Sequence, residues 1–183
     1  MKWTKPYSRK MLSLPTEPIL TERLLLRTMR EDDIPSLWLM DSDPDVMKYI
    51  PTPILDKQTY LADMKKDFHE AERFKFFLII ADKKTDEAIG WLLFRPTEDG
   101  KWVELGYRLL KKQWGKGYVP EAARAIIRIG FNDLGLTEVM LVLIKENKKS
   151  QKVAEKLGFT YQGIRKFYNM DLAFYLLKKT LIG

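Results

Sequence analysis

The short segment Gln113-Trp114-Gly115-Lys116-Gly117-Tyr118 carries two glycines one residue apart. An extended apolar segment precedes it, and a helix is predicted directly after it, from about Pro120 to Leu134. Glycine lets a backbone approach a phosphate closely, and the unpaired N–H groups at a helix start point toward an anion. The stretch therefore predicts an anion-binding loop, although a Gly-x-Gly pair also occurs in ordinary turns.

The helix predicted after this loop is strongly amphipathic. Its apolar residues recur at helical spacing and would face a core: Ala123, Ile126, Ile127, Gly130, Phe131 and Leu134. Its opposite face is polar and comprises Glu121, Arg124, Arg128 and Asn132. The loop and the helix together predict a strand–loop–helix unit.

The composition favours one globular domain. Of the 183 residues, 45% are hydrophobic and 12% aromatic, which suffices for a substantial core. We expect an N-terminal extension over residues 1–18, where prolines interrupt any periodicity, and a single domain over residues 19–183. No apolar run has the length of a membrane span or of a signal peptide, so a cytoplasmic protein without membrane contact is the simplest interpretation.

The content of reactive residues excludes several chemistries. Without cysteine the chain can form no disulfide, thiolate metal site or cysteine nucleophile. The one histidine, His69, falls in a predicted helix, where packing is favoured over catalysis, and no metal site is expected. The net charge of +7 suits nucleic acid or an anionic cofactor, but the positive residues form no long block, which favours a solvated surface.

The remaining periodicity predicts an α/β domain. Strands are expected at 22–27, 76–81, 88–95, 102–109, 139–144, 161–166 and 170–178. Helices are expected at about 30–41, 57–73 and 148–157, with Asp56 as the N-cap of the second. Strands that are apolar on both faces imply a mixed sheet covered by helices on both sides.

Three groups of motifs occur in a fixed order along the chain. The first is Thr21-Glu22-Arg23-Leu24-Leu25-Leu26-Arg27, with Glu104-Leu105-Gly106-Tyr107 further on. The second is the glycine loop, and the third is Asn147-Lys148-Lys149-Ser150 followed by Glu155-Lys156-Leu157-Gly158-Phe159. Together they resemble the GNAT superfamily of acetyl-CoA-dependent N-acetyltransferases, most closely the branch that acetylates ribosomal-protein N-termini. The resemblance extends from about residue 20 to the C-terminus.

This resemblance implies a mostly antiparallel central sheet that splays between the strands at 102–109 and 139–144. The pantetheine arm of acetyl-CoA would lie in the split, with its pyrophosphate on the glycine loop. The implied cofactor-binding residues are Leu109, Gln113, Trp114, Gly115, Lys116, Gly117, Tyr118, Val119, Asn147 and Ser150. The pair Val119-Pro120 departs from the family pattern, because valine is bulky there and proline has no N–H to give a phosphate.

Acetyl transfer to an amine needs a deprotonated nucleophile, a polarised thioester and a proton for the leaving thiolate. Without cysteine, direct attack in a ternary complex is the economical mechanism. Glu104 is the candidate base, directly or through a water, and its alternative role is an ion pair with Arg108. Ser150 matches a serine that the family places near the sulfur, whereas Ala154 stands where many relatives have a tyrosine acid. Asn147 is also expected to cap the helix at 148–157.

The acceptor is expected to be a primary amine, either a protein N-terminus or a small molecule. Arg165 and Lys166 would disfavour a polycation, whereas three early carboxylates would favour one: Asp41, Asp43 and Asp45. Aromatic candidates for the acceptor pocket are Trp38, Tyr49, Tyr60, Phe167 and Tyr168.

Two other functions stay open at this point. One is a non-catalytic CoA-binding sensor, suggested by Val119, Pro120 and the missing tyrosine. The other, ranked last, is a nucleic-acid-binding module that uses the basic extension, since basic and aromatic residues are not interleaved as such modules require. The sequence leaves a homodimer open.

Overall fold

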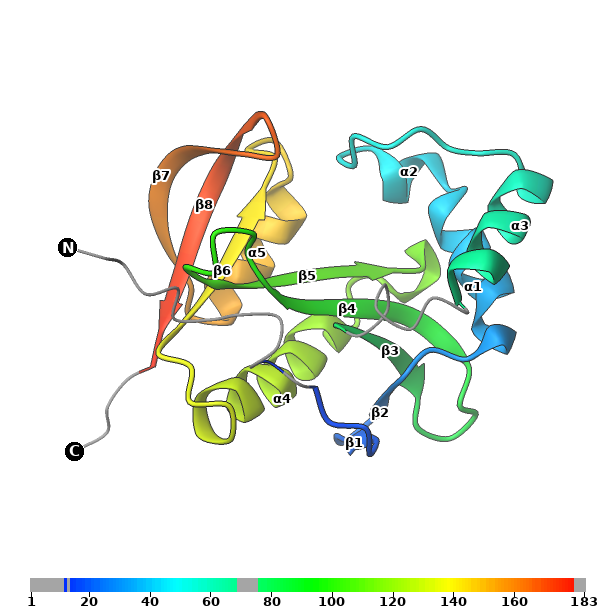
Figure 1. The fold of residues 1–183 in the computed structure, drawn as a ribbon, viewed down its shortest axis with the longest axis horizontal. Coiled ribbons are helices and arrows are strands. Elements are labelled where there is room, and N and C mark those ends of the chain that lie inside the picture. Colours follow the sequence, from blue (N-terminus) through cyan, green and yellow to red (C-terminus); the bar gives the residue numbers. More distant parts are fainter. Residues whose placement is uncertain (1–11, 13, 69–75, 180–183) are drawn as a thin grey trace. The chain divides into compact units, whose positions relative to one another are not determined.

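The computed structural model describes residue 12 and residues 14–68 and 76–179 (Figure 1). Its strands are β1 (Ile19–Leu20), β2 (Leu24–Arg27), β3 (Phe77–Asp82), β4 (Ala88–Pro96), β5 (Val103–Leu109), β6 (Glu138–Leu143), β7 (Thr160–Phe167) and β8 (Met170–Lys178). Its α-helices are α1 (Ile34–Asp41), α2 (Pro44–Met47), α3 (Lys57–Phe68), α4 (Tyr118–Asn132) and α5 (Lys148–Lys156). Two 3-10 turns, η1 (Glu31–Asp33) and η2 (Lys111–Gln113), complete the order.

The strands form one mixed sheet in the order β1-β2-β3-β4-β5-β6-β8-β7. Strands β5 and β6 run parallel, whereas β1–β2, β2–β3, β3–β4, β6–β8 and β7–β8 are antiparallel. The predicted mixed, mostly antiparallel sheet is therefore confirmed.

The sheet splays between β5 and β6. Within the described residues, these strands pair only at Val103 with Val139 and at Glu104 with Met140. Strand β6 nevertheless continues to pair with β8 as far as Leu143. The strands thus separate just after Glu104, as the resemblance implied.

The chain divides into two compact units, and each is described by itself. The loop unit comprises Leu14–Leu93 and Tyr107–Ala122, and the hairpin unit contains Phe94–Gly106 and Ala123–Gly183. Strands β4 and β5 and helix α4 each run from one unit into the other.

In the loop unit, α1 and α3 cover one face of the sheet. Apolar side chains of both helices pack on residues of β3 and β4 that include Ile79 and Ala81. The rings of Trp38 and Tyr60 lie 5.3 Å apart in this cluster. Helix α3 begins as predicted, because the carboxylate of Asp56 accepts hydrogen bonds from the N–H and the hydroxyl of Thr59.

The start of α1 differs from the prediction. A single helix was expected from about residue 30, but the chain first forms η1 and then α1. The reason is Asp33, whose carboxylate accepts both branches of the Arg27 guanidinium at 2.8 Å and the N–H of Arg30 at 2.7 Å. Both Arg27 and Asp33 are 4% exposed, so this acid is a buried ion-pair partner that also caps the start of η1.

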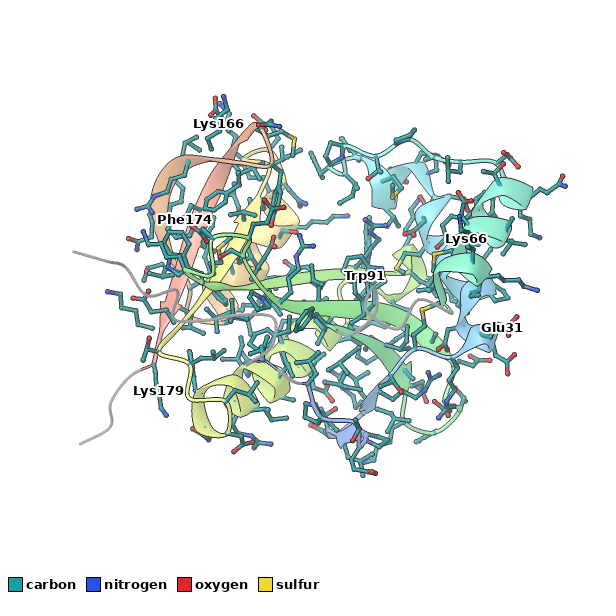
Figure 2. All side chains as sticks on the ribbon, viewed as in Figure 1. Glu31, Lys66, Trp91, Lys166, Phe174 and Lys179 are labelled. Carbon is teal, nitrogen blue, oxygen red and sulfur yellow. The ribbon has the colours of Figure 1, made fainter. Side chains whose placement is uncertain are left out.

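In the hairpin unit, an aromatic cluster packs on one face of the sheet around Phe174 of β8, which is labelled in Figure 2. Trp102 lies 5.3 Å from Phe174, and Met140 and Leu176 join them. Helix α4 passes so close to β4 that a Cβ at Gly130 would lie 2.9 Å from the ring of Phe94. Phe94 and Trp91 lie an odd number of residues apart on β4, so their side chains point to opposite faces of the strand. Trp91 packs with α1 and α3. Each face of β4 therefore contacts helices, as predicted.

Most element boundaries lie within two residues of the predictions, and β1 alone among the strands was not expected. Leu12 and Leu14 of the predicted extension are buried. His69, the predicted helix beyond Phe68 and the basic residues at the N-terminus fall outside the described residues. None of the described helices has the length and apolar character needed to cross a membrane.

Candidate active site

The glycine loop links the end of β5 to the start of α4, within the loop unit. Strand β5 ends at Leu109, η2 follows, and the backbone then turns at Gly115 with φ of 78° and at Gly117 with φ of 81°. Residues with a Cβ rarely adopt this left-handed region, so the turn requires glycine at both places. The two glycines of the contiguous sequence therefore permit this turn.

Five successive backbone N–H groups in this loop are unpaired. Helix α4 makes its first bond from the N–H of Glu121 to the carbonyl of Gly117, at 3.2 Å. In the described part of the chain, no acceptor pairs with the amides from Gly115 to Val119. These amides and the positive end of the helix dipole form a site suited to a diphosphate.

The two departures from the family pattern have different consequences. Val119 is 6% exposed, so its side chain packs inside and does not cover the loop amides. Pro120 is the third residue of α4, and the helix begins two residues earlier than predicted. The amides of Tyr118 and Val119 therefore precede the proline, and only one N–H is lost.

Side chains also tie the loop to itself. The indole N–H of Trp114 donates to the carbonyl of Leu109 at 3.1 Å, and its ring packs against the cluster under α1 and α3. The ammonium group of Lys116 donates to the side-chain carbonyl of Gln113 at 2.8 Å. Two of the predicted cofactor-binding side chains, Gln113 and Lys116, thus contact each other at the surface.

Glu104 lies in the hairpin unit, at the last paired position before β5 and β6 separate. It is 7% exposed, although it carries a carboxylate. The guanidinium of Arg95 on β4 lies 3.3 Å from its Oε2, and the hydroxyl of Tyr168 donates to the same oxygen. Arg95 also donates to the Tyr168 hydroxyl at 3.2 Å. We call these three side chains the Glu104 centre.

The position of Tyr168 depends on a tight turn. Phe167 pairs with Met170, so β7 and β8 are joined by two residues only, Tyr168 and Asn169, with φ of 52° and 60°. Burial, followed by the charge of Glu104, raises the pKa of Tyr168 to about 12. The phenol therefore stays a neutral hydrogen-bond donor to the carboxylate.

Sequence reasoning did not find Arg95 or Tyr168 as partners of Glu104. Arg108, the alternative partner, instead forms an ion pair with Asp41 and lies with its guanidinium 5.0 Å from the ring centre of Trp91 (Figure 2).

Asn147 caps α5, as predicted, because its side-chain oxygen accepts the N–H of Ser150 at 3.1 Å. Both residues are half-buried. Ala154, at the place of the family tyrosine, is fully buried in the helix-sheet packing. Asn147 and Ser150 therefore lie together at the first turn of α5.

The three early carboxylates are already engaged by other groups. Asp41 accepts from Arg108 and, at 2.9 Å, from the hydroxyl of Tyr60. Asp43 caps α2 through the N–H of Asp45, at 2.8 Å, and Asp45 pairs with Lys111. The ion pairs weaken the attraction of Asp41 and Asp45 for an added cation, and the acceptor preference of these acids stays a prediction.

The structure brings the predicted residues together in three groups. The glycine loop and Leu109 form one in the loop unit. The hairpin unit holds the other two, which are Glu104 with its partners and Asn147 with Ser150.

Comparison with known proteins identifies the family. The acetyltransferase (GNAT) domain family matches residues 23–160. The uncharacterized N-acetyltransferase p20 of Bacillus licheniformis is 35% identical over 158 residues, which cover 83% of this chain and 87% of that protein. The chain therefore belongs to the GNAT acetyltransferase family, and it is an N-acetyltransferase.

Solved structures show the same fold. The GNAT acetyltransferase from Bacillus anthracis aligns with a TM-score of 0.76 at 26% identity, covering 88% of this chain and 98% of its own. RimL, a ribosomal L7/L12 α-N-protein acetyltransferase solved with coenzyme A, aligns with a TM-score of 0.70 at 17% identity and covers the same shares. The resemblance to the ribosomal-protein branch is confirmed at the level of the fold.

Proposed function

We propose that this protein transfers an acetyl group from acetyl-CoA to a primary amine by direct attack in a ternary complex. The observation that supports the donor most strongly is the run of five unpaired amides from Gly115 to Val119 at the start of α4. Such a run binds a diphosphate without any side chain, and the pyrophosphate of CoA supplies one. Lys116 adds a point charge beside it.

The proposal assigns the remaining donor contacts to three places. Asn147 and Ser150, at the start of α5, lie beside the pantetheine arm and the sulfur, respectively. A backbone N–H near the end of β5, between Tyr107 and Leu109, polarises the thioester carbonyl. The separation of β5 from β6 just after Glu104 supports a path for the pantetheine arm.

The chemical step needs Glu104 as the base. Its carboxylate takes a proton from the acceptor ammonium or amine, directly or through a water, and the nitrogen lone pair forms a bond to the acetyl carbon. The carbon–sulfur bond then breaks, and the CoA thiolate leaves with the electron pair. The hydroxyl of Ser150 donates a hydrogen bond to that thiolate. The nitrogen loses its remaining extra proton, which passes to the thiolate, so the products are the acetylated amine and CoA with a free thiol.

Tyr168 is assigned to hold Glu104 and not to protonate the thiolate. With a pKa of about 12, its phenol is a far weaker acid than a thiol, whose ordinary pKa is about 8.5. Its hydroxyl donates to the carboxylate oxygen that Arg95 also contacts. The base is therefore held by two partners from two other parts of the chain.

The acceptor is a protein N-terminus or a small-molecule amine of low positive charge. Asp41 and Asp45 are each ion-paired and Asp43 caps α2, which weakens the attraction of this segment for a polyamine. Arg165 and Lys166 are exposed on β7 and repel polycations.

The experiment that tests this function measures binding and turnover separately. Calorimetry with CoA reports the donor site, and release of free thiol from acetyl-CoA is followed across peptides, monoamines and polyamines. Binding with thiol release that is faster for a peptide or monoamine than for a polyamine supports the proposal. Binding without turnover on any amine would instead indicate a CoA sensor, and the absence of binding would refute the donor assignment.

A further inference from the structure

The first turn of α4 is fastened to the segment that leads into β2. Glu121 accepts three hydrogen bonds from that segment, all within the loop unit. They come from the hydroxyl of Thr21 at 2.6 Å, from the N–H of Arg23 at 2.8 Å and from the Nε of Arg23 at 2.7 Å. A second guanidinium nitrogen, Nη2, also lies 2.7 Å from the carboxylate. This two-branched contact fixes the orientation of the guanidinium.

The remaining nitrogen of Arg23 contacts the glycine loop itself. Its Nη1 donates to the carbonyl of Lys116 at 2.9 Å. The guanidinium also lies 4.7 Å from the ring centre of Tyr118, the first residue of α4. One arginine therefore contacts the middle of the loop and both ends of the first helical turn.

The contact with Lys116 sets the direction of a loop amide. In a planar trans peptide, the carbonyl of one residue and the N–H of the next point in opposite directions. Because the Lys116 carbonyl points to Arg23, the N–H of Gly117 points away from it. That N–H is one of the five unpaired amides.

The charge of Glu121 is unfavourable for an anion site unless it has another purpose. A carboxylate in the first turn of α4 repels a phosphate bound there. Burial alone would raise its pKa, but the hydrogen bonds from Thr21 and Arg23 hold the pKa below its usual value, so the group stays charged. The helix dipole favours a carboxylate in a first turn, but the contacts to Thr21 and Arg23 give this charge a further role beside the anion-binding loop.

We propose that Arg23 and Glu121 are positioning residues that hold the amides of the glycine loop in the orientation that binds the pyrophosphate of acetyl-CoA. This proposal rests on the assignment of that pyrophosphate to the loop. Arg23 acts through the Lys116 carbonyl, and Glu121 acts through Arg23. Neither side chain needs to touch the ligand.

The direction in which Glu121→Ala changes the affinity for CoA distinguishes a positioning role from a simple effect of charge. Glu121→Ala removes a negative charge, so charge alone predicts tighter CoA binding. Loss of the positioning contacts predicts weaker binding, by about tenfold, which is typical of a lost charge-assisted hydrogen bond. Arg23→Gln should weaken CoA binding by a similar factor. The double variant should bind CoA no more weakly than either single variant, because both substitutions remove the same Arg23–Glu121 contact.

Two other ligands show which part of CoA the substitutions of Arg23 and Glu121 affect. With S-acetylpantetheine, which lacks the pyrophosphate, kcat/KM should stay within about twofold of the wild-type value in both variants. The affinity of Arg23→Gln for 3′-dephospho-CoA should fall by the same factor as its affinity for CoA. A loss confined to CoA would show that Arg23 contacts the 3′-phosphate directly, which would overturn the positioning role.

The controls distinguish a lost positioning role from a loss of folding and from a failure of the proposed function. Arg30→Ala removes another exposed arginine, paired with Asp86 and not with the loop, and should leave CoA affinity unchanged. Arg23→Lys keeps the charge and should recover part of the affinity even where Arg23→Gln unfolds. If folded Glu121→Ala bound CoA as tightly as the wild-type protein or more tightly, the positioning role of Arg23 and Glu121 alone would be refuted. If the wild-type protein did not bind CoA, both the proposed donor site and this positioning role would be refuted.

Discussion

The glycine loop and the Glu104 centre are built in opposite ways. The loop is one contiguous stretch that offers backbone N–H groups, and two glycines with positive φ allow its turn. The Glu104 centre consists of side chains from β4, β5 and the turn between β7 and β8, up to 73 residues apart in the chain. A site made of backbone tolerates changes of side chain that a site made of side chains does not.

The largest effect is expected at the Glu104 centre. Glu104→Gln keeps the shape and hydrogen-bonding capacity of the side chain but removes the base, so kcat should fall by about 100-fold or more. The affinity for CoA should stay within about twofold, because the loop is unchanged. Steady-state kinetics and calorimetry measure the two quantities. Glu98→Gln, on an exposed turn of the same unit, serves as the control. A kcat that stays near the wild-type value in Glu104→Gln would remove Glu104 from the mechanism.

CoA binding should weaken when a glycine of the loop is replaced by a residue that disfavours positive φ. Gly117→Ala meets no backbone atom, and its Cβ would lie 3.5 Å from the Arg23 guanidinium, so the cost comes from φ. An L-residue in this region costs about 1–2 kcal/mol, which corresponds to about tenfold weaker CoA binding if the loop relaxes.

Gly163→Ala is a matched control for this change. Gly163 has φ of 95°, and a Cβ there meets no atom within 4 Å, but it lies on β7 and not in the loop. Its substitution should leave CoA affinity unchanged. A similar loss of affinity in both variants would show that the effect is a general loss of stability.

A smaller effect is expected from Tyr168→Phe, with a defined pH dependence. Loss of the hydroxyl should lower kcat by about fivefold, since one hydrogen bond to the base is removed. A raised pKa means that the neutral, donating phenol persists well above the ordinary value of about 10. The ratio of wild-type to variant kcat should therefore stay constant from about pH 7 to about pH 10. A ratio that falls to one near pH 10 would show an ordinary phenol.

The sequence predicted what contiguous residues determine. The loop from Gln113 to Val119, the cap at Asn147 and the order of strands and helices follow from local spacing, and the structure reproduces them. The start of α4 was placed two residues late because proline usually marks the first turn, whereas Pro120 is the third residue here. Glu104 was chosen as the candidate base from its place before the loop, and its catalytic role stays a prediction.

The sequence could not predict contacts between distant segments. Arg95 and Tyr168 reach Glu104 only because β4, β5 and the β7–β8 turn meet in the sheet. Likewise, Asp41 and Asp45 looked available to a cationic acceptor until Arg108 and Lys111 were found beside them. Side-chain pairing across a fold is set by topology, which local periodicity does not encode.

We expect the backbone amides of the glycine loop to bind the pyrophosphate of CoA, and amide NMR can observe this binding residue by residue. In a titration of the ¹⁵N-labelled protein with CoA, the amide signals of Gly115, Lys116, Gly117, Tyr118 and Val119 should shift strongly and saturate together. Pantetheine, which has no pyrophosphate, should leave them unchanged. Saturable CoA binding that leaves these five signals in place while shifting others would contradict the account.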